Sequence, residues 1–153
     1  MFNRNFINEI LSNVELEKIS EEIKKQELKT SGELRVAIKE KRGFFDRKKS
    51  IRELAIKEFY RLSIDRTSER SGILFFILLK EKQFYILPDE GITKKLTQDF
   101  WDGLALEVQK FFKEKNFYEG IIFVLRECGK VLEKHFPRKP DDINELSDSV
   151  AIV

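Results

Sequence analysis

The amino-acid sequence predicts a three-layer α/β/α sandwich, in which helices cover both faces of a small mixed sheet. An unbroken apolar run at 73–79 is typical of a strand buried on both faces, and such a strand requires helices on both sides. Segments with an apolar residue every three or four positions lie before and after it, so helices and strands alternate along the chain. The expected order is helix, strand, helix, strand, strand, helix, helix.

The first half of the chain predicts two parallel strands joined by a helix. Ser12 and Glu15 fit a capping box that opens the first helix. Alternating polar and apolar residues at 33–38 indicate a half-buried strand. A charged connection then leads to a second helix over about 49–62, and that helix to the strand at 73–79. A strand, a helix and a strand in this order favour a right-handed crossover between parallel strands.

The second half predicts an antiparallel hairpin followed by two long helices. A polar turn after the strand at 73–79 leads to a return strand at 84–87, which Pro88 ends. A helix over about 97–115 follows, and Thr97 at its start can cap it. The last helix covers about 118–134, before two prolines.

The composition fits one folded domain of ordinary size. The chain has 153 residues, with 29 basic and 27 acidic side chains, so its net charge of +2 gives no reason to expect a nucleic-acid partner. Its single cysteine excludes an internal disulfide and is consistent with a reducing compartment. No signal-peptide core and no apolar run long enough to span a bilayer occur, so we expect a cytoplasmic protein without a transmembrane segment.

We expect a single domain over 13–136. An N-terminal segment at 1–12 precedes it, and an acidic, loosely ordered C-terminal tail at 137–153 follows it. Cys128 lies on the apolar stripe of the last helix, which favours a buried thiol over a nucleophile. The chain has no glycine-rich phosphate-binding loop and no zinc-ligand motif.

Three polar segments should meet at one edge of the sheet. The two parallel strands begin at this edge and the return strand ends there, so 31–33, 69–72 and 88–91 should converge. Their carboxylates are the ligands that Ca²⁺ and Mg²⁺ prefer, and Asp102 begins a helix close by in the sequence. The alternative is a structural ion pair between Glu33 and Arg70, with the other acids solvated.

A basic connection, Lys39 to Arg52, should lie at the opposite edge of the sheet. It holds seven basic and two acidic residues, with Phe44 and Phe45 in its middle. Such a segment could contact anionic lipid, nucleic acid or phosphate. We favour a solvated loop whose two phenylalanines pack into the core, because charge runs are usually solvated surfaces. Peripheral membrane contact through this loop is therefore the less favoured alternative.

Several short motifs resemble the TPM domain, which occurs in bacteria and in a plant thylakoid-lumen phosphatase. The resemblance covers about residues 13–150, and its last motif is similar to the tail of the short, soluble bacterial members. Pro88 is a departure, because many relatives have glycine before the Asp-Glu-Gly motif. The motifs are Thr30–Val36, Thr67, Arg70–Leu74, Asp89–Ile92, Phe100–Asp102, His135–Pro137 and Asp142–Asp148.

The resemblance implies an α/β/α sandwich that binds a divalent cation, Ca²⁺ or Mg²⁺, in an acidic edge pocket. It places the metal ligands at Glu33, Asp89, Glu90 and Asp102, with Arg70 orienting a carboxylate or a phosphate oxygen. For the thylakoid member it also implies acid phosphatase activity, and a weak metal-dependent hydrolase of phosphate monoesters would use Asp89 as its base. The alternative is a non-enzymatic protein–protein interaction module in membrane-protein maintenance or assembly, with an unknown partner.

Overall fold

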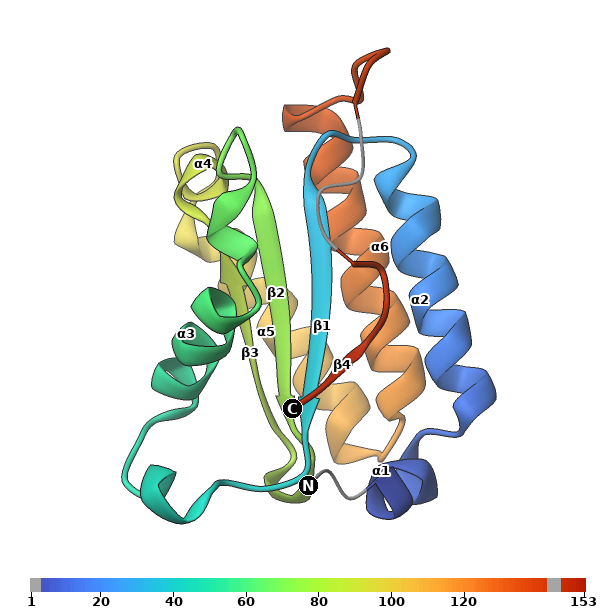
Figure 1. Ribbon diagram of the computed structural model, residues 1–153, viewed down its shortest axis with the longest axis vertical. Helices are drawn as coiled ribbons and strands as arrows, with labels where there is room; N and C mark the ends of the chain where they lie inside the picture. Colours follow the sequence, from blue (N-terminus) through green and yellow to red (C-terminus); the bar gives the residue numbers. More distant parts are fainter. Residues whose placement is uncertain (1–3, 143–146) are drawn as a thin grey trace.

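A computed structural model describes residues 4–142 and 147–153 and confirms the predicted fold class (Figure 1). Over this part of the chain the sheet has four strands in the order β3-β2-β1-β4. The strands β1 and β2 are parallel, and β2 and β3 form the expected antiparallel hairpin. The strands are β1 Glu33–Lys39, β2 Gly72–Leu78, β3 Gln83–Pro88 and β4 Ala151–Ile152.

The long helices form where the sequence predicts them. Capping boxes open two of them, with Ser12 and Glu15 before α2 and Ser50 and Glu53 before α3. Thr97 holds the N-cap position of α5, but its side chain makes no capping hydrogen bond. The helices are α1 Arg4–Ile10, α2 Asn13–Glu27, α3 Ile51–Arg61, α4 Glu90–Thr93, α5 Gln98–Lys113 and α6 Phe117–His135.

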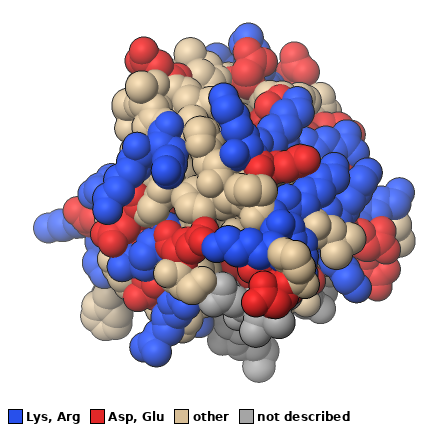
Figure 2. All heavy atoms as spheres, turned by 90° about the horizontal axis from the view of Figure 1, so that it is seen from above, with Lys and Arg blue, Asp and Glu red and all other residues tan. Residues whose placement is uncertain are grey.

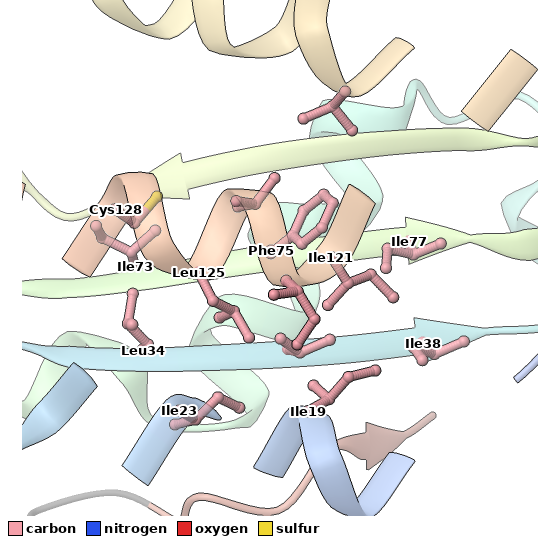
Figure 3. Packing of buried hydrophobic residues seen from close by; sticks show 14 of the residues in the cluster. Ile19, Ile23, Leu34, Ile38, Ile73, Phe75, Ile77, Ile121, Leu125 and Cys128 are labelled. Carbon is pink, nitrogen blue, oxygen red and sulfur yellow. The ribbon is translucent and has the colours of Figure 1, made fainter. Parts of the chain in front are cut away.

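Alternate residues of the strands enter two separate cores. Val36 and Phe75 face the larger core, which α1, α2, α5 and α6 complete, and Figure 3 shows Phe75 packed against side chains of α6. Ala37 and Phe76 face the smaller core under α3. Every residue of β2 is buried, which explains why this strand reads as one apolar run.

The C-terminus contributes a strand that the sequence analysis does not predict. β4 runs parallel to β1, with Ala37 opposite Ala151 and Ile38 opposite Ile152. The amide of Val153 also donates to the carbonyl of Ile38 at 2.9 Å. The end of the chain, expected to be loosely ordered, therefore forms an edge of the sheet.

The short helix α1 was also not expected, and it places Ile7 in the larger core together with Leu11, which follows the helix. The division into 1–12, 13–136 and 137–153 stays a prediction. Residues 143–146, which belong to the last motif of the resemblance, lie outside the described residues. Within the described residues, no helix has both the length and the apolar character needed to cross a bilayer.

The expectation that Phe44 and Phe45 pack into the core is wrong. Their side chains are 71% and 92% exposed. The reason lies in the short 3-10 turn η1, Phe44–Asp46, whose inward-facing residue is Asp46. Its buried carboxylate lies 3.0 Å from Lys49 Nζ and 3.5 Å from Lys57 Nζ, and the two rings are left on the outside of the turn.

Candidate functional site

The three polar segments meet at the amino-terminal end of β1 and β2, as predicted. Glu33 pairs with Gly72, and Asp89 N donates to Gly72 O at 2.9 Å, so the segments are side by side. Gly91 allows the closest approach, because a Cβ there would lie 2.2 Å from Glu69 O. The absence of a side chain at Gly91 thus lets α4 begin directly against the turn at 69–70.

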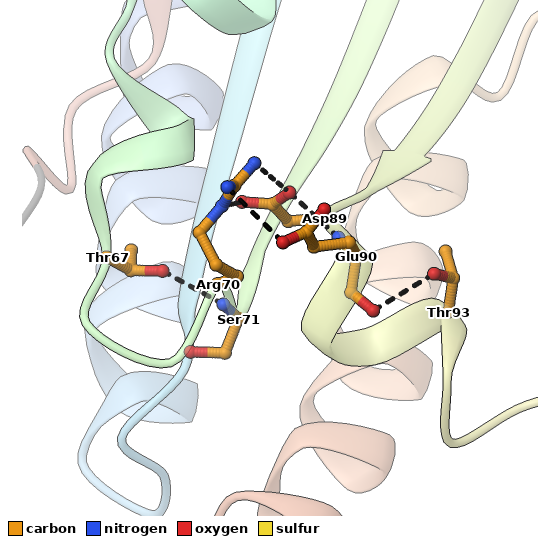
Figure 4. A network of polar contacts seen from close by, with 6 residues as sticks. All are labelled: Thr67, Arg70, Ser71, Asp89, Glu90 and Thr93. Atoms are coloured by element: carbon orange, nitrogen blue, oxygen red, sulfur yellow. Dashed lines mark hydrogen bonds and ion pairs between the residues drawn. The ribbon is translucent and has the colours of Figure 1, made fainter.

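Arg70 and Asp89 form a two-pronged ion pair at the centre of this end (Figure 4). Arg70 Nε donates to Asp89 Oδ2 at 2.8 Å and Nη2 donates to Oδ1 at 2.9 Å. Asp89 Oδ1 also accepts the Glu90 amide at 2.8 Å and so caps α4, while Glu90 Oε1 lies 3.4 Å from Arg70 Nη1. The hydrogen bond to Asp89 raises the pKa of Arg70. Both oxygens of the 5%-exposed Asp89 therefore already have partners.

Two hydroxyl groups support this ion pair. Thr67 Oγ1 accepts the buried amide of Ser71 at 2.9 Å, which fixes the turn that carries Arg70. Thr93 Oγ1 donates to Glu90 O at 3.0 Å within α4 (Figure 4). Arg70 has a positive φ of 51°, a conformation that costs energy for a residue with a side chain. The turn is thus built to hold the Arg70 guanidinium against Asp89.

Glu33 is separated from Asp89 by the middle strand. Two strand spacings put their backbones about 10 Å apart. Ile64 covers the intervening Gly72, where a Cβ would lie 2.5 Å from Ile64 Cγ2. For Arg70 the sequence offers Glu33 as the alternative ion-pair partner, whereas the structure gives it Asp89 and Glu90.

Glu33 instead belongs to a group of three carboxyls, which we call the Glu27 cluster: Glu27, Glu33 and Asp148. They come from the end of α2, the start of β1 and the segment before β4. Glu27 is 4% exposed and Glu33 is 2% exposed. Glu27 Oε2 accepts the amide of Leu34 at 2.7 Å, on the edge of β1 that faces β4 but lies beyond the residues that β4 pairs with. The cluster therefore closes the open edge of β1.

Glu27 interacts with both of the other carboxyls of the Glu27 cluster, and like charges at such close range repel one another unless they are neutralised. Glu27 is hydrogen-bonded to the side chains of Asp148 and Glu33. Burial, followed by these two contacts, raises the pKa of Glu27 to about 11. Within the described residues, Glu27 Oε1 is buried and receives no N–H or hydroxyl donor. A proton or a cation between the carboxyl oxygens would remove the repulsion among these like charges.

Two arginines lie close to the Glu27 cluster, Arg35 and Arg138. Arg35 interacts electrostatically with Glu27 and Asp148, although burial lowers its pKa. Arg138 Nη1 lies nearby but donates to the backbone carbonyl of Glu27, at 2.9 Å. Arg35 supplies one positive charge against the three negative charges of the ionised cluster.

Asp102 does not join either group of acids. It is exposed on α5, accepts a hydrogen bond from Gln98 Nε2 at 3.0 Å, and lines a cavity of about 300 Å³ beside β3.

Figure 2 looks onto the end of the molecule that carries the site, where basic and acidic side chains are interleaved. Within residues 4–142 and 147–153, no three acidic, histidine or cysteine side chains are already arranged to hold a metal ion.

Cys128 is fully buried in α6, as its position on the apolar stripe predicts. Burial raises the pKa of its thiol to about 12, so it is not a nucleophile near neutral pH.

A family model described as the TPM domain matches residues 7–131, which is most of the chain. The chain belongs to the TPM domain family. This TPM domain is similar in structure to the BA42 protein from the psychrophilic bacterium Bizionia argentinensis, which was solved by NMR. The two are 31% identical, the match covers 94% of this chain and 95% of that chain, and the TM-score is 0.83. No curated protein matches the chain.

Sequence reasoning on this TPM domain missed Glu27 and the role of Asp148. Glu27 lies in a helix where glutamate and lysine alternate with apolar residues, so nothing in the local pattern sets it apart. Its position one turn before the Thr30–Val36 motif was the available signal. Asp148 belongs to the tail motif of the resemblance, but its approach to Glu27 depends on how the tail folds back.

Proposed function

We propose that this TPM domain binds a divalent cation, Ca²⁺ or Mg²⁺, at the Glu27 cluster. The observation that carries the proposal is that Glu27 interacts with the side chains of Glu33 and Asp148, and that two of these three carboxyls are buried. The three side chains are not already arranged around a metal ion, so they would have to move closer together to bind one. Such a group requires a proton or a cation, and carboxylate oxygens are hard ligands that suit these two ions. Arg35 offsets one charge of the ionised cluster, and one divalent cation would offset the other two.

The Asp89 and Glu90 pair supports a different role. Both oxygens of Asp89 bind Arg70, and Glu90 is exposed beside the same guanidinium. A cation there would have to compete with a two-pronged ion pair. We therefore assign Arg70 and Asp89 to holding the turn and α4 together, and of the four ligands that the resemblance suggests, we retain Glu33.

Proton release distinguishes cation binding at the Glu27 cluster from surface binding. A proton held by the carboxyls at neutral pH would have to leave when a cation takes its place. Titration calorimetry with Ca²⁺ and then Mg²⁺, in buffers of different ionisation enthalpy, counts the protons released. We expect saturable binding with proton release for the unaltered protein.

Two substitutions complete the test. Glu27→Gln removes a ligand and the titrating group while keeping the shape of the side chain, so binding should be lost. Glu90→Gln is the matched control, since it also replaces one glutamate at this end of the sheet, and binding should remain. An absence of saturable binding at millimolar cation, or equal binding by both variants, would refute the assignment.

Hydrolysis of phosphate monoesters stays a prediction that rests on the resemblance. Asp89, the base that it suggests, has both oxygens bound to Arg70. A phosphatase assay with and without Ca²⁺ tests it, and turnover that Asp89→Asn abolishes while the fold is retained would establish it. The interaction module in membrane-protein maintenance is the alternative, and it too stays a prediction.

A further inference from the structure

The connection between β1 and α3 presents two phenylalanine rings to solvent at the end of the molecule opposite the Glu27 cluster. It projects from the lower left of the fold in Figure 1. Phe44 and Phe45 contact each other edge to face, with ring centroids 5.3 Å apart. Exposing two adjacent phenylalanines costs solvation energy in a free domain, so their position calls for a function.

The loop is held in place by polar contacts on both sides of the rings. Arg42 Nε binds Glu81 at 2.9 Å, and Arg42 also donates to the carbonyl of Lys49, so the base of the loop is tied to the β2–β3 turn. Asp46 binds Lys49 and Lys57, and Ser50 caps α3 directly afterwards. The hydrogen bond from Lys49 lowers the pKa of Asp46, which stays ionised. The rings are therefore presented by a braced turn.

The loop also carries positive charge that internal ion pairs do not use. Its two acids are matched within the fold, Asp46 as above and Glu40 by Lys80 at 3.2 Å. Lys41 and Lys48 are exposed and form no ion pair with a described residue. Arg47 lies over the Phe44 ring, with its Cζ 4.7 Å from the centroid. The exposed rings of Phe44 and Phe45 thus lie in a loop whose exposed cations can bind an anionic partner.

We propose that this loop docks the domain onto a bilayer surface that contains anionic lipids. Phe44 and Phe45 would enter the interface between headgroups and acyl chains, where amphipathic and aromatic groups bind. The exposed cations of the loop would bind headgroup phosphates, and their charge complements that of the lipid. The residues concerned are Lys41, Arg47 and Lys48.

The geometry favours a lipid surface over single-stranded nucleic acid or a protein. Nucleic-acid binding by aromatic residues needs free ring faces along a basic groove. Here one face of Phe44 is covered by Arg47, and Phe45 stands against its ring. A stable protein interface needs about 800 Å² from each partner, more than a two-ring tip offers, whereas a bilayer accepts a small convex tip.

This inference is independent of the cation proposal, because the two involve residues at opposite ends of the sheet. Vesicle flotation tests it with the full chain, using neutral phosphatidylcholine vesicles and vesicles with about one third phosphatidylglycerol. We expect binding to the anionic vesicles, weakened by added salt, and at least about tenfold weaker binding to the neutral ones. Failure to bind the anionic vesicles at low salt would overturn the proposal.

Two variants and their controls locate the contact. Phe45→Ser and the pair Lys41→Glu with Lys48→Glu should each lower binding to anionic vesicles about tenfold. Leu106→Ser changes an exposed apolar residue on α5, and Lys94→Glu with Lys95→Glu changes two exposed lysines that follow α4, and both should leave binding unchanged. Full binding by Phe45→Ser would refute insertion.

Fluorescence gives a direct readout of insertion. Trp101 is buried, so a tryptophan introduced by Phe45→Trp would add an exposed emitter to a buried one. Anionic vesicles should shift its emission to shorter wavelength, as expected when an indole leaves water. The proposal would be overturned if the emission did not shift. It would also be overturned if the loop bound a single-stranded oligonucleotide or a protein partner but did not bind vesicles.

Discussion

Gly91 shows how a single missing side chain determines the geometry of the candidate site. A Cβ at this position would lie 2.2 Å from Glu69 O and 2.6 Å from Arg70 O, and both atoms are backbone that cannot rotate away. We predict that Gly91→Ala destabilises the domain by about 3 kcal/mol, because α4 must move away from the turn. Urea unfolding measures the change.

Gly103 is the matched control for this substitution. It lies inside α5, and a Cβ there would meet nothing within 4 Å. Gly103→Ala should therefore stabilise the domain by about 1 kcal/mol, the ordinary gain in helix propensity. If both substitutions had the same effect on the unfolding free energy, the close approach at Gly91 would not be real.

At the scale of the elements, the last strand, β4, covers the edge of β1 that faces away from β2. The carbonyl of Ile38 accepts the amide of Val153, so the N–H of Ile38 lies on the side of β1 that faces β4. The neighbouring residue Ala37 presents its N–H to β2. These two adjacent amides therefore report on opposite edges of the same strand.

We predict that deletion of residues 151–153 speeds amide exchange at Ile38 about tenfold or more, while the fold is retained. The amide of Ala37 should keep its protection, because its pairing with β2 is unchanged. Hydrogen–deuterium exchange followed by NMR resolves the two positions. Equal acceleration at both amides would mean that β4 supports the whole sheet, and no acceleration at Ile38 would mean that β4 does not pair in solution.

At the scale of the whole molecule, the sequence predicts the elements that carry their own pattern. The apolar run of β2 and the capping boxes at Ser12 and Ser50 locate strands and helices from local chemistry. β4 has two residues and no such pattern, since it exists only through pairing with β1. The same holds for Asp148, which meets Glu27 only after the tail returns to the sheet.

The candidate site divides in the same way. Convergence of the three polar segments follows from strand direction, and the sequence predicts it. Strand direction does not tell which of these side chains contact one another. Gly72 leaves room for Ile64 between Glu33 and Asp89, and this separates the acids into two groups. Phe44 and Phe45 point outward because Asp46 takes the inward position in the turn. The spacing of apolar residues in the sequence does not predict this position.

The Glu27 cluster makes the stability of the whole domain depend on pH. The pKa of Glu27 is raised from 4.5 to about 11 in the folded chain, so the folded state keeps a proton that the unfolded state loses. Between these values the folded state binds more protons, and stability must therefore fall as the pH rises. Below about pH 4.5 both states hold the proton, and this group has no effect on stability.

We predict that in the presence of a chelator the unfolding free energy falls between about pH 7 and pH 8.5, by up to about 1.4 kcal/mol per pH unit. Cys128, whose buried thiol also has a raised pKa in the folded chain, adds to the slope near pH 8.5, but it adds equally to a variant that differs only at Glu27. Glu27→Gln keeps a hydrogen-bonding side chain without a titrating group, and its stability should depend less on pH. Urea unfolding of both proteins across this range measures the two slopes. Equal slopes would mean either that the proton resides on another carboxyl of the Glu27 cluster or that the carboxyls do not meet. The Glu33→Gln variant distinguishes these two cases. It should flatten the slope if the proton resides on another carboxyl, and leave the slope unchanged if the carboxyls do not meet.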